Sequence, residues 1–241
     1  MPAVVVKDLK FSWRGGSNLL DIPRFDLDTG DRVFLHGPSG SGKSTLLNLL
    51  TGMLLPQQGS IHISGTDIAS LSGARRDQYR ADKIGFIFQT LNLLPYLSLT
   101  DNVAMACRFS ETKEAYAISQ HGSVGKAAAY FLERLGLAEP LQRNAKVTEL
   151  SVGQQQRVAV ARALIGSPSL IIADEPTSAL DKQAREQFVA ILNELVSDLN
   201  TTLIMVSHDE ALASSFKRSV PLTQLNEVTR LESKVGQSYV G

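Results

Sequence analysis

Short apolar runs alternate along this chain with longer segments in which apolar residues recur at helical spacing. The runs predict strands at residues 4–11, 31–36, 61–63, 84–88, 170–173 and 202–206. The helical spacing predicts helices at residues 44–50, 154–165 and 181–195. Because strands alternate with helices, the pattern favours a parallel sheet that is covered by helices on both faces.

The middle of the chain follows a different pattern. Residues 90–99 contain Pro95 and several leucines, which is typical of a loop or an interface. Residues 101–136 carry apolar side chains at helical spacing and predict a helical insert. Within the insert, the polar stretch 110–126 predicts a short helix followed by a surface loop.

Composition narrows the class of protein. With 241 residues and 43% hydrophobic content, the chain is large enough to bury a core. Its 24 basic and 24 acidic residues leave no net basic field, so no nucleic-acid partner is expected. Cys107 is the single cysteine and is expected to be a small apolar residue in a reducing compartment. We expect no signal peptide and no spanning helix, so any membrane would be crossed by another chain.

A glycine-rich loop follows the second predicted strand and precedes a predicted helix. Its residues fit the pattern G-x-x-x-x-G-K-[ST] and are Gly37, Pro38, Ser39, Gly40, Ser41, Gly42, Lys43, Ser44 and Thr45. Glycines let backbone N–H groups wrap closely round phosphates at the N-terminus of a helix. Lys43 would add positive charge at the β- and γ-phosphates, and the Ser44 hydroxyl would ligate Mg²⁺. The loop predicts binding of ATP with Mg²⁺.

Two carboxylates end the apolar strand at residues 170–173. Asp174 is placed to hold the Mg²⁺ shell and Glu175 to orient an attacking water. The same segment taken alone also fits a core strand followed by a pair of acidic helix-capping residues. The glycine-rich loop alone does not name a function, because kinases, GTPases and many motors share it, so the rest of the chain must decide among these classes.

The segment Leu150 to Arg157, with the sequence LSVGQQQR, resembles the LSGGQ signature of the ABC transporter ATPases. The order of motifs along the chain is also similar to that family. Gln89 follows an apolar strand, the signature precedes the acidic strand, Ser178 to Asp181 follows it, and His208 ends the next strand. The chain is thereby identified as a member of the ABC transporter ATPases.

The resemblance implies a fold and an activity. The fold would be α/β, a P-loop NTPase (RecA-like) parallel-sheet core with an N-terminal antiparallel β subdomain and a helical signature subdomain. The single domain 1–241 would divide into the core with its β subdomain at about 1–90 and 158–241, and the helical subdomain at about 91–157. The activity would be hydrolysis of ATP coupled to transport.

The resemblance also implies residue roles. Members of the family work as head-to-tail dimers in which each ATP lies between the loop of one subunit and the signature of the other. The residues expected to contact ATP on the partner are Ser151, Gly153 and Gln154, with Asp181 reaching across the interface. Glu175 would be the general base, His208 the γ-phosphate sensor, and Gln89 a neighbour of Mg²⁺ and the water. Trp13 would stack on adenine, or else be a core or rim aromatic.

Two positions depart from the family pattern. Val152 stands where glycine is usual, and it is expected to tighten or displace the signature loop because valine disfavours positive φ. The segment 143–147 lacks the proline that commonly precedes the signature. These departures put the rate of ATP hydrolysis in question more than the role of the signature, since Ser151, Gly153 and Gln154 are intact.

Residues 85–95 and 99–103 resemble the branch of the family that includes the LolD lipoprotein-release and MacB macrolide-export ATPases. That branch implies transmembrane permease subunits moved by a lever action and a peripheral place on the cytoplasmic face of the inner (cell) membrane. An importer ATPase, a soluble ABC ATPase without a membrane partner, a small-molecule kinase and a subunit that binds ATP without turnover are the alternatives. The transported substrate, the direction of transport and the role of residues 219–241 are not encoded in any recognisable pattern.

Overall fold

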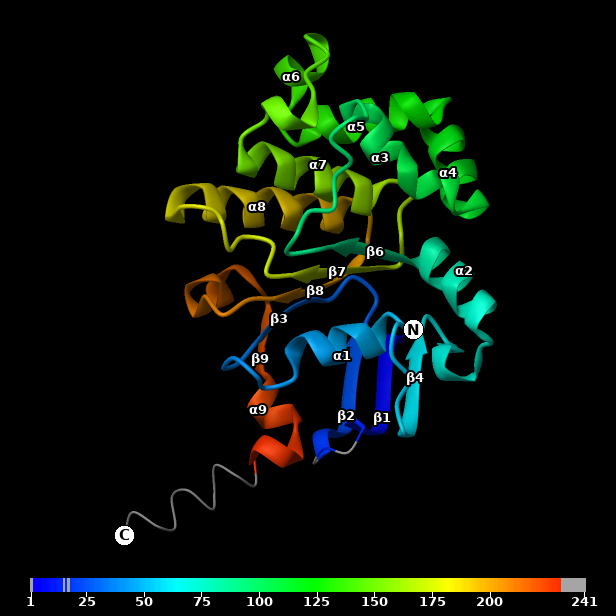
Figure 1. The fold of residues 1–241 in the computed structure, drawn as a ribbon, viewed down its shortest axis with the longest axis vertical. Coiled ribbons are helices and arrows are strands. Elements are labelled where there is room, and N and C mark those ends of the chain that lie inside the picture. Colours follow the sequence, from blue (N-terminus) through cyan, green and yellow to red (C-terminus); the bar gives the residue numbers. More distant parts are fainter. Residues whose placement is uncertain (1, 15, 17, 231–241) are drawn as a thin grey trace.

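The computed structural model describes residues 2–14, 16 and 18–230, and it contains two sheets (Figure 1). The antiparallel sheet has the order β2-β1-β4-β5, with β1 (Pro2–Ser12), β2 (Asn18–Asp28), β4 (Gln58–Ile63) and β5 (Thr66–Asp67). The parallel sheet has the order β6-β7-β8-β3-β9, with β6 (Ile84–Ile87), β7 (Leu170–Asp174), β8 (Thr202–Val206), β3 (Arg32–His36) and β9 (Arg218–Pro221).

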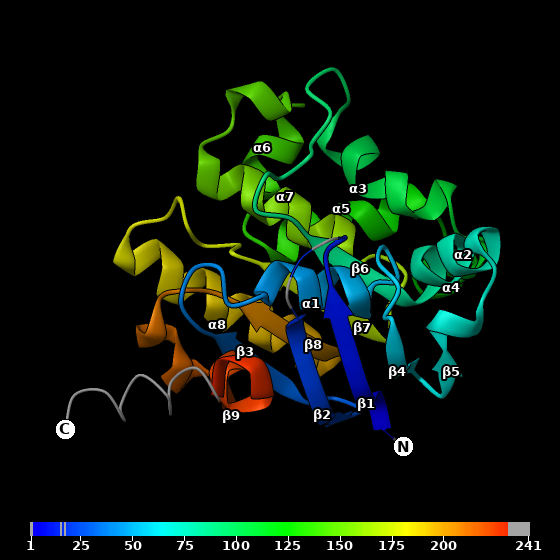
Figure 2. The same cartoon turned by 60° about the horizontal axis from the view of Figure 1, so that its bottom comes forward.

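Helices cover both faces of the parallel sheet. The helices of the described chain are α1 (Lys43–Leu50), α2 (Gly73–Lys83), α3 (Leu99–Arg108), α4 (Glu111–His121), α5 (Val124–Arg134), α6 (Ala138–Gln142), α7 (Val152–Leu164), α8 (Lys182–Asp198) and α9 (Leu222–Leu225). Short 3-10 turns lie at Ile68–Ser70, Val147–Glu149 and Glu210–Ser215. In Figures 1 and 2, α7 and α8 lie on one side of the parallel sheet, while α1 and the antiparallel sheet lie on the other.

The alternation of side chains along each strand produces these two layers. In β7, Leu170 and Ile172 join the cluster that contains α1 and the antiparallel sheet. Ile171 and Ala173 join the cluster that contains α3, α5, α7 and α8. Successive side chains of a strand point to opposite faces, so an uninterrupted apolar strand is buried on both. The parallel sheet, the antiparallel sheet and the helical layer confirm the predicted fold class.

The helical layer differs in part from its prediction. Residues 110–126 contain not only a helix and a turn but also the start of a second long helix, α5. Gly122 ends α4 at φ 80°, and Ser123 begins α5 by accepting a hydrogen bond from the Lys126 N–H. A left-handed glycine followed at once by a serine N-cap turns the chain within two residues, so the expected surface loop is a tight helix–helix connection.

Several further elements were not predicted, among them β2, β9 and α2. The strand β2 is interrupted in pattern by Pro23, and β9 is only four residues long. The helix α2 has no buried residue, so it shows no apolar stripe in the sequence.

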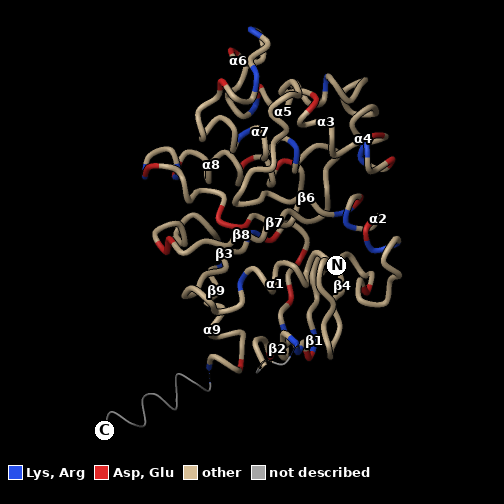
Figure 3. The backbone as a smooth tube through the Cα atoms, viewed as in Figure 1, with Lys and Arg blue, Asp and Glu red and all other residues tan. Residues whose placement is uncertain are grey.

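In the described part of the chain, no helix is long and apolar enough to cross a bilayer. Basic and acidic residues are interspersed along the backbone, in agreement with the zero net charge (Figure 3).

The register of the parallel sheet brings three loops to one edge. Leu35 in β3 and Asp174 in β7 both pair with Val206, which ends β8. Because parallel strands share their direction, the segments after residues 36, 174 and 206 leave the sheet at the same edge. These are the segments in which the sequence places the glycine-rich loop, the second carboxylate and the histidine.

Candidate active site

The glycine-rich loop connects β3 to α1. Gly40 and Gly42 take φ values of 80° and 96°, which side chains other than glycine rarely adopt. Gly42 is the N-cap of α1 and makes no side-chain capping hydrogen bond, so the first N–H groups of the helix face the loop. A Cβ on Gly42 would lie 2.7 Å from Leu20 Cδ2. Backbone donors at an uncapped helix N-terminus are suited to bind phosphate.

Two side chains of the loop are positioned for an anion. The Lys43 Nζ donates to the carbonyl oxygens of Gly37 and Pro38, at 2.7 Å and 2.9 Å, which holds the ammonium over the loop. The Ser41 Oγ is buried and has no hydrogen-bond partner within the described residues. A buried hydroxyl without a partner is costly, and a phosphate oxygen would supply one.

Asp174 lies beside the start of α1. Burial raises the pKa of its carboxyl above the ordinary value, and the neighbouring Glu175 carboxylate raises it further. The hydrogen bond with the Ser44 side chain and the charge of Lys43 act in the opposite direction. The predicted pair of Ser44 and Asp174 is thus in direct contact, and a divalent cation there would favour the ionised carboxylate. No group of three His, Cys, Asp or Glu side chains suited to a metal occurs in the described chain.

Glu175 is held at the same edge by the loop after β8. Its Oε2 accepts from Ser207 Oγ at 3.2 Å and lies 2.9 Å from His208 Nδ1. The Glu175 side chain is 14% exposed, whereas that of His208 is 70% exposed. Glu175 has φ 46°, and its N–H donates to the Val206 carbonyl at 2.9 Å. A glutamate in the left-handed region is strained, and such strain is often found at functional sites.

Gln89 and Trp13 border this edge from two other directions. Gln89 is exposed and follows β6, whose Ile87 pairs with Ala173 next to Asp174. Trp13 is 54% exposed and packs edge-on against Phe11 at 5.2 Å between ring centroids. It lines a cavity of about 370 Å³ together with Leu19, Gly40, Gly42, Lys43, Ser44 and Thr45. An exposed indole at the rim of a phosphate loop has a free face for a base to stack on.

The signature residues form the N-terminus of α7. Ser151 Oγ accepts from the Gln154 N–H at 3.3 Å, and Gln154 Oε1 accepts from the Ser151 N–H at 2.9 Å, so the two form a capping box. A Cβ on Gly153 would lie 3.2 Å from Leu180 Cδ2. Asp181 is the N-cap of α8 and accepts from the Ala184 N–H. In the described chain, no hydrogen bond joins residues 151–154 to residues 37–45.

The prediction for Val152 assumed that this position needs a positive φ, and that assumption is wrong. Val152 is the first residue of α7 and does not have a positive φ. A helical backbone accepts valine without the strain that a left-handed turn would impose. Its side chain is 50% exposed, so the substitution changes the surface next to Ser151 rather than the course of the backbone.

Several residues that support the site were missed by sequence reasoning. Ser207, which donates to Glu175, was not singled out. Arg162 on α7 donates to the carbonyls of Leu91 and Asn92, each at 2.7 Å, and Asn102 accepts from the Leu94 N–H at 2.8 Å. These contacts fix the segment after Gln89 to the helical layer. No pattern local to Arg162 reveals a partner 70 residues away.

A strand, a glycine-rich loop and a helix at the edge of a parallel sheet, with Asp174 against Ser44, define a P-loop nucleoside triphosphatase. The family model of the ABC transporter matches residues 20–178. The chain therefore belongs to the ABC transporter family and is an ATP-binding ATPase cassette, as its sequence motifs predicted.

Relatives of known name agree with this assignment. The chain is 38% identical over 220 residues to the macrolide export ATP-binding/permease protein MacB of Bdellovibrio bacteriovorus, covering 90% of this chain and 32% of MacB. It is 38% identical over 216 residues to the lipoprotein-releasing system ATP-binding protein LolD of Alcanivorax borkumensis, covering 88% and 91%. The chain thus spans about a third of the MacB relative and nearly all of LolD.

A solved structure is also similar. The ATP-binding cassette MJ0796, in a dimeric post-hydrolysis state bound to ADP and Pi, superimposes with a TM-score of 0.75 at 32% identity. The match covers 90% of this chain and 93% of the MJ0796 chain.

Proposed function

We propose that this chain is the ATP-hydrolysing subunit of a transporter of the export or lipoprotein-release type, and that it acts as a head-to-tail dimer on separate transmembrane subunits. The observation that carries the proposal is the division of the site. Ser44, Asp174, Glu175 and His208 converge at one sheet edge, whereas Ser151 and Gln154 form their side-chain hydrogen bonds with each other at the start of α7. A second copy would bring the missing half.

The residues at the sheet edge fit MgATP. Ser44 and Asp174 would hold Mg²⁺, which normally keeps waters and phosphate oxygens as its other ligands and would offset the phosphate charge. Glu175 would accept a proton from the attacking water. His208 lies against the same Glu175 oxygen, and its exposed ring is free to turn toward a γ-phosphate. Gln89 would approach the water from the β6 side.

The dimer would complete the site with a helix N-terminus. The capping box of Ser151 and Gln154 presents the first turn of α7, whose dipole and free N–H groups favour an anion. Asp181, exposed at the start of α8, would reach across the interface. The dimeric state of the MJ0796 cassette supports this arrangement.

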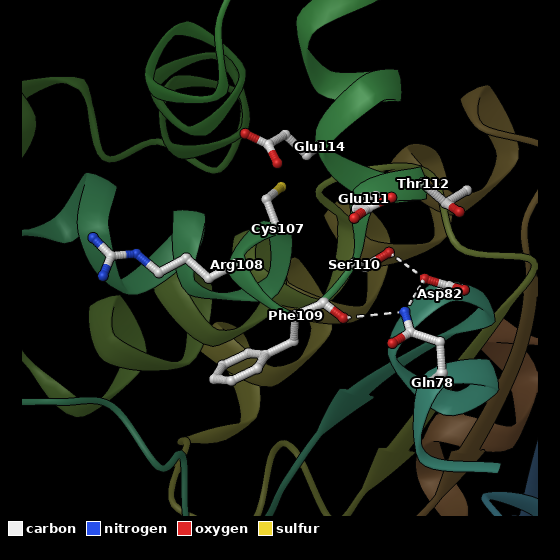
Figure 4. Close-up of a pocket in the computed structure, with 9 residues that line it drawn as sticks. All are labelled: Gln78, Asp82, Cys107, Arg108, Phe109, Ser110, Glu111, Thr112 and Glu114. Carbon is white, nitrogen blue, oxygen red and sulfur yellow. Dashed lines mark hydrogen bonds between the residues drawn. The ribbon is translucent and has the colours of Figure 1, made fainter. Parts of the chain in front are cut away.

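A membrane subunit would dock on the helical layer beside residues 89–99. Arg162 ties this segment to α7, so a push on it would be transmitted to the signature helix. Tyr96 is 78% exposed on the segment, and Phe109 is 66% exposed at the end of α3. Figure 4 shows Phe109 at a cavity of about 560 Å³ between α2 and the turn from α3 to α4. An exposed aromatic beside a cavity, as Phe109 is here, is typical of protein interfaces.

The edges of this cavity are held together by hydrogen bonds. Ser110 Oγ donates to Asp82 Oδ1 at 2.6 Å, and Gln78 Nε2 donates to the Phe109 carbonyl at 3.4 Å (Figure 4). These bonds join α2, which precedes β6, to the helical layer. A segment seated here would contact both parts of the fold and could move one relative to the other.

The names of the relatives favour the export or release type over an importer. MacB is named for macrolide export and LolD for lipoprotein release. The same relatives support permease partners and a peripheral place at the membrane. A soluble ABC ATPase is the remaining alternative, and copurification with a multi-span membrane protein would separate the two.

The catalytic assignment is tested with Glu175→Gln, measured by ATP hydrolysis and by light scattering after size exclusion. We expect turnover to fall by about a hundredfold or more, with a dimer that persists in MgATP but not in MgADP. Glu186→Gln, an exposed carboxylate on α8, is the matched control and should keep wild-type turnover. Wild-type turnover in Glu175→Gln would remove Glu175 from its role, and a monomer under all conditions would remove the dimer.

A further inference from the structure

The strand β2 forms one edge of the antiparallel sheet, so its outer backbone groups have no strand to pair with. A side chain from the far end of the chain meets them. Asn226 Nδ2 donates to the Leu19 carbonyl at 2.8 Å, and Asn226 Oδ1 accepts from the Asp21 N–H at 2.8 Å. One amide therefore satisfies a donor and an acceptor on a strand more than 200 residues away.

Asn226 is fully buried and is fixed by its own backbone. Its N–H donates to the Leu222 carbonyl at 2.8 Å, and its carbonyl accepts from Thr229 Oγ1 at 3.0 Å. Leu222 is also buried, and a Cβ on Gly37 would lie 3.6 Å from Leu222 Cβ. The helix α9 therefore joins the edge of β2 to the beginning of the glycine-rich loop.

The part of β2 that Asn226 holds lies at the base end of the candidate nucleotide site. Leu19 lines the same cavity as Trp13, and Leu20 packs under Gly42. Ser12 pairs with Asn18, which closes the hairpin that carries Trp13. A displacement of β2 at Leu19 would thus move one wall of the cavity and the segment that carries the Trp13 indole.

We infer that Asn226 is a positioning residue that sets the affinity of the cassette for the base of the nucleotide through Leu19 and Trp13. The inference rests on the proposed ATP site. It gives the C-terminal segment a task in nucleotide recognition. Hydrogen bonds to an open strand edge hold that edge in one position, and their loss leaves two part-buried backbone groups without these partners.

The test compares ATP with inorganic tripolyphosphate, which has no base. For Asn226→Ala, we expect the Kd for ATP to rise about tenfold and the Kd for tripolyphosphate to change by less than about twofold. Trp13 is the single tryptophan of the chain, so its fluorescence reports directly on the base end. The quenching of this fluorescence by saturating ATP should decrease in the variant. In hydrolysis, KM for ATP should rise while kcat stays within about twofold.

Gln224→Ala is the matched control, because Gln224 lies on α9 with an exposed side chain. Asn226→Ser serves as the second variant where alanine prevents folding, since it places a polar hydroxyl at the buried position but is too short to hold both groups of β2. Equal losses of affinity for ATP and tripolyphosphate would overturn the inference, and so would wild-type affinity for both. Failure of the wild-type protein to bind ATP would remove the proposed function and this inference together.

Discussion

The two halves of the proposed nucleotide site are built differently. At the phosphate-loop edge, side chains that directly follow β7 and β8 contact one another, as in the bonds of Glu175 to Ser207 and His208. At the signature end, Ser151 and Gln154 are satisfied by each other within one turn of α7. One half is assembled by the sheet, and the other is a self-contained helix N-terminus that faces outward.

This difference has a physical consequence for catalysis. A converging cluster can bind and polarise MgATP from one side, while a helix N-terminus adds donors only where another chain carries the anion to it. The hydrogen bonds of Arg162 to the carbonyls of residues 91 and 92 attach α7 to the segment that follows β6. We therefore expect the helical layer to move relative to the sheet during the ATPase cycle, while the phosphate-loop edge stays rigid.

The largest expected effect comes from inactivating the phosphate loop in one chain and the signature in another. Lys43→Ala removes the cation of the phosphate loop, and Ser151→Arg blocks the signature with a long side chain. Each alone should lower ATP turnover by about fiftyfold or more. Mixed in equal amounts, the two variants should regain up to roughly a quarter of the wild-type rate, because half of the random dimers carry one intact composite site. Steady-state phosphate release measures this recovery.

The control is a double variant that carries both substitutions in one chain. Assayed alone at the same total concentration, it should show no recovery of turnover. If the single variants also fail to complement each other, the two halves do not come from different chains. A retained rate in Ser151→Arg alone would show that the phosphate-loop edge hydrolyses ATP unaided.

The second effect concerns the attachment of the helical layer. Lys113 on α4 is 3% exposed, and its Nζ donates to the Ile84 carbonyl at 2.9 Å, at the start of β6. Burial lowers the pKa of Lys113 from 10.5 to about 8, against the opposing influence of Cys107 and Asp82. The folded protein releases this proton at a lower pH than the unfolded chain. Folding stability therefore rises as the pH increases above about 8.

Urea unfolding of the wild type and of Lys113→Met checks this linkage. Between pH 7.5 and 9, the wild type should gain about 1 kcal/mol relative to the variant. Burial raises the pKa of Cys107 to about 11, which lowers stability at still higher pH, but the thiol is present in both proteins and cancels in the difference. A difference that does not change with pH would show that Lys113 stays charged in the folded protein.

Sequence reasoning named most of the residues at the phosphate-loop edge, but it named few of the long-range contacts that support this edge. Gly37 to Thr45, Asp174 and Glu175 were predicted because each motif is contiguous and its chemistry demands particular residue types. Arg162 and Asn226 were missed because their partners lie 70 and more than 200 residues away. The helix α2 was missed because none of its residues is buried, so nothing in its pattern marks a face.

The smallest expected effect tests the signature end itself. Val152→Gly restores the residue that the family usually has, yet Val152 already lies in a helical first turn. Turnover should change by no more than about twofold, and stability should fall by roughly 0.5 kcal/mol, because glycine has the lower helix propensity. Parallel assays of phosphate release and urea unfolding measure both quantities. A severalfold gain in turnover would show that the exposed valine side chain restricts approach of the partner's nucleotide, and the signature end would then limit the rate.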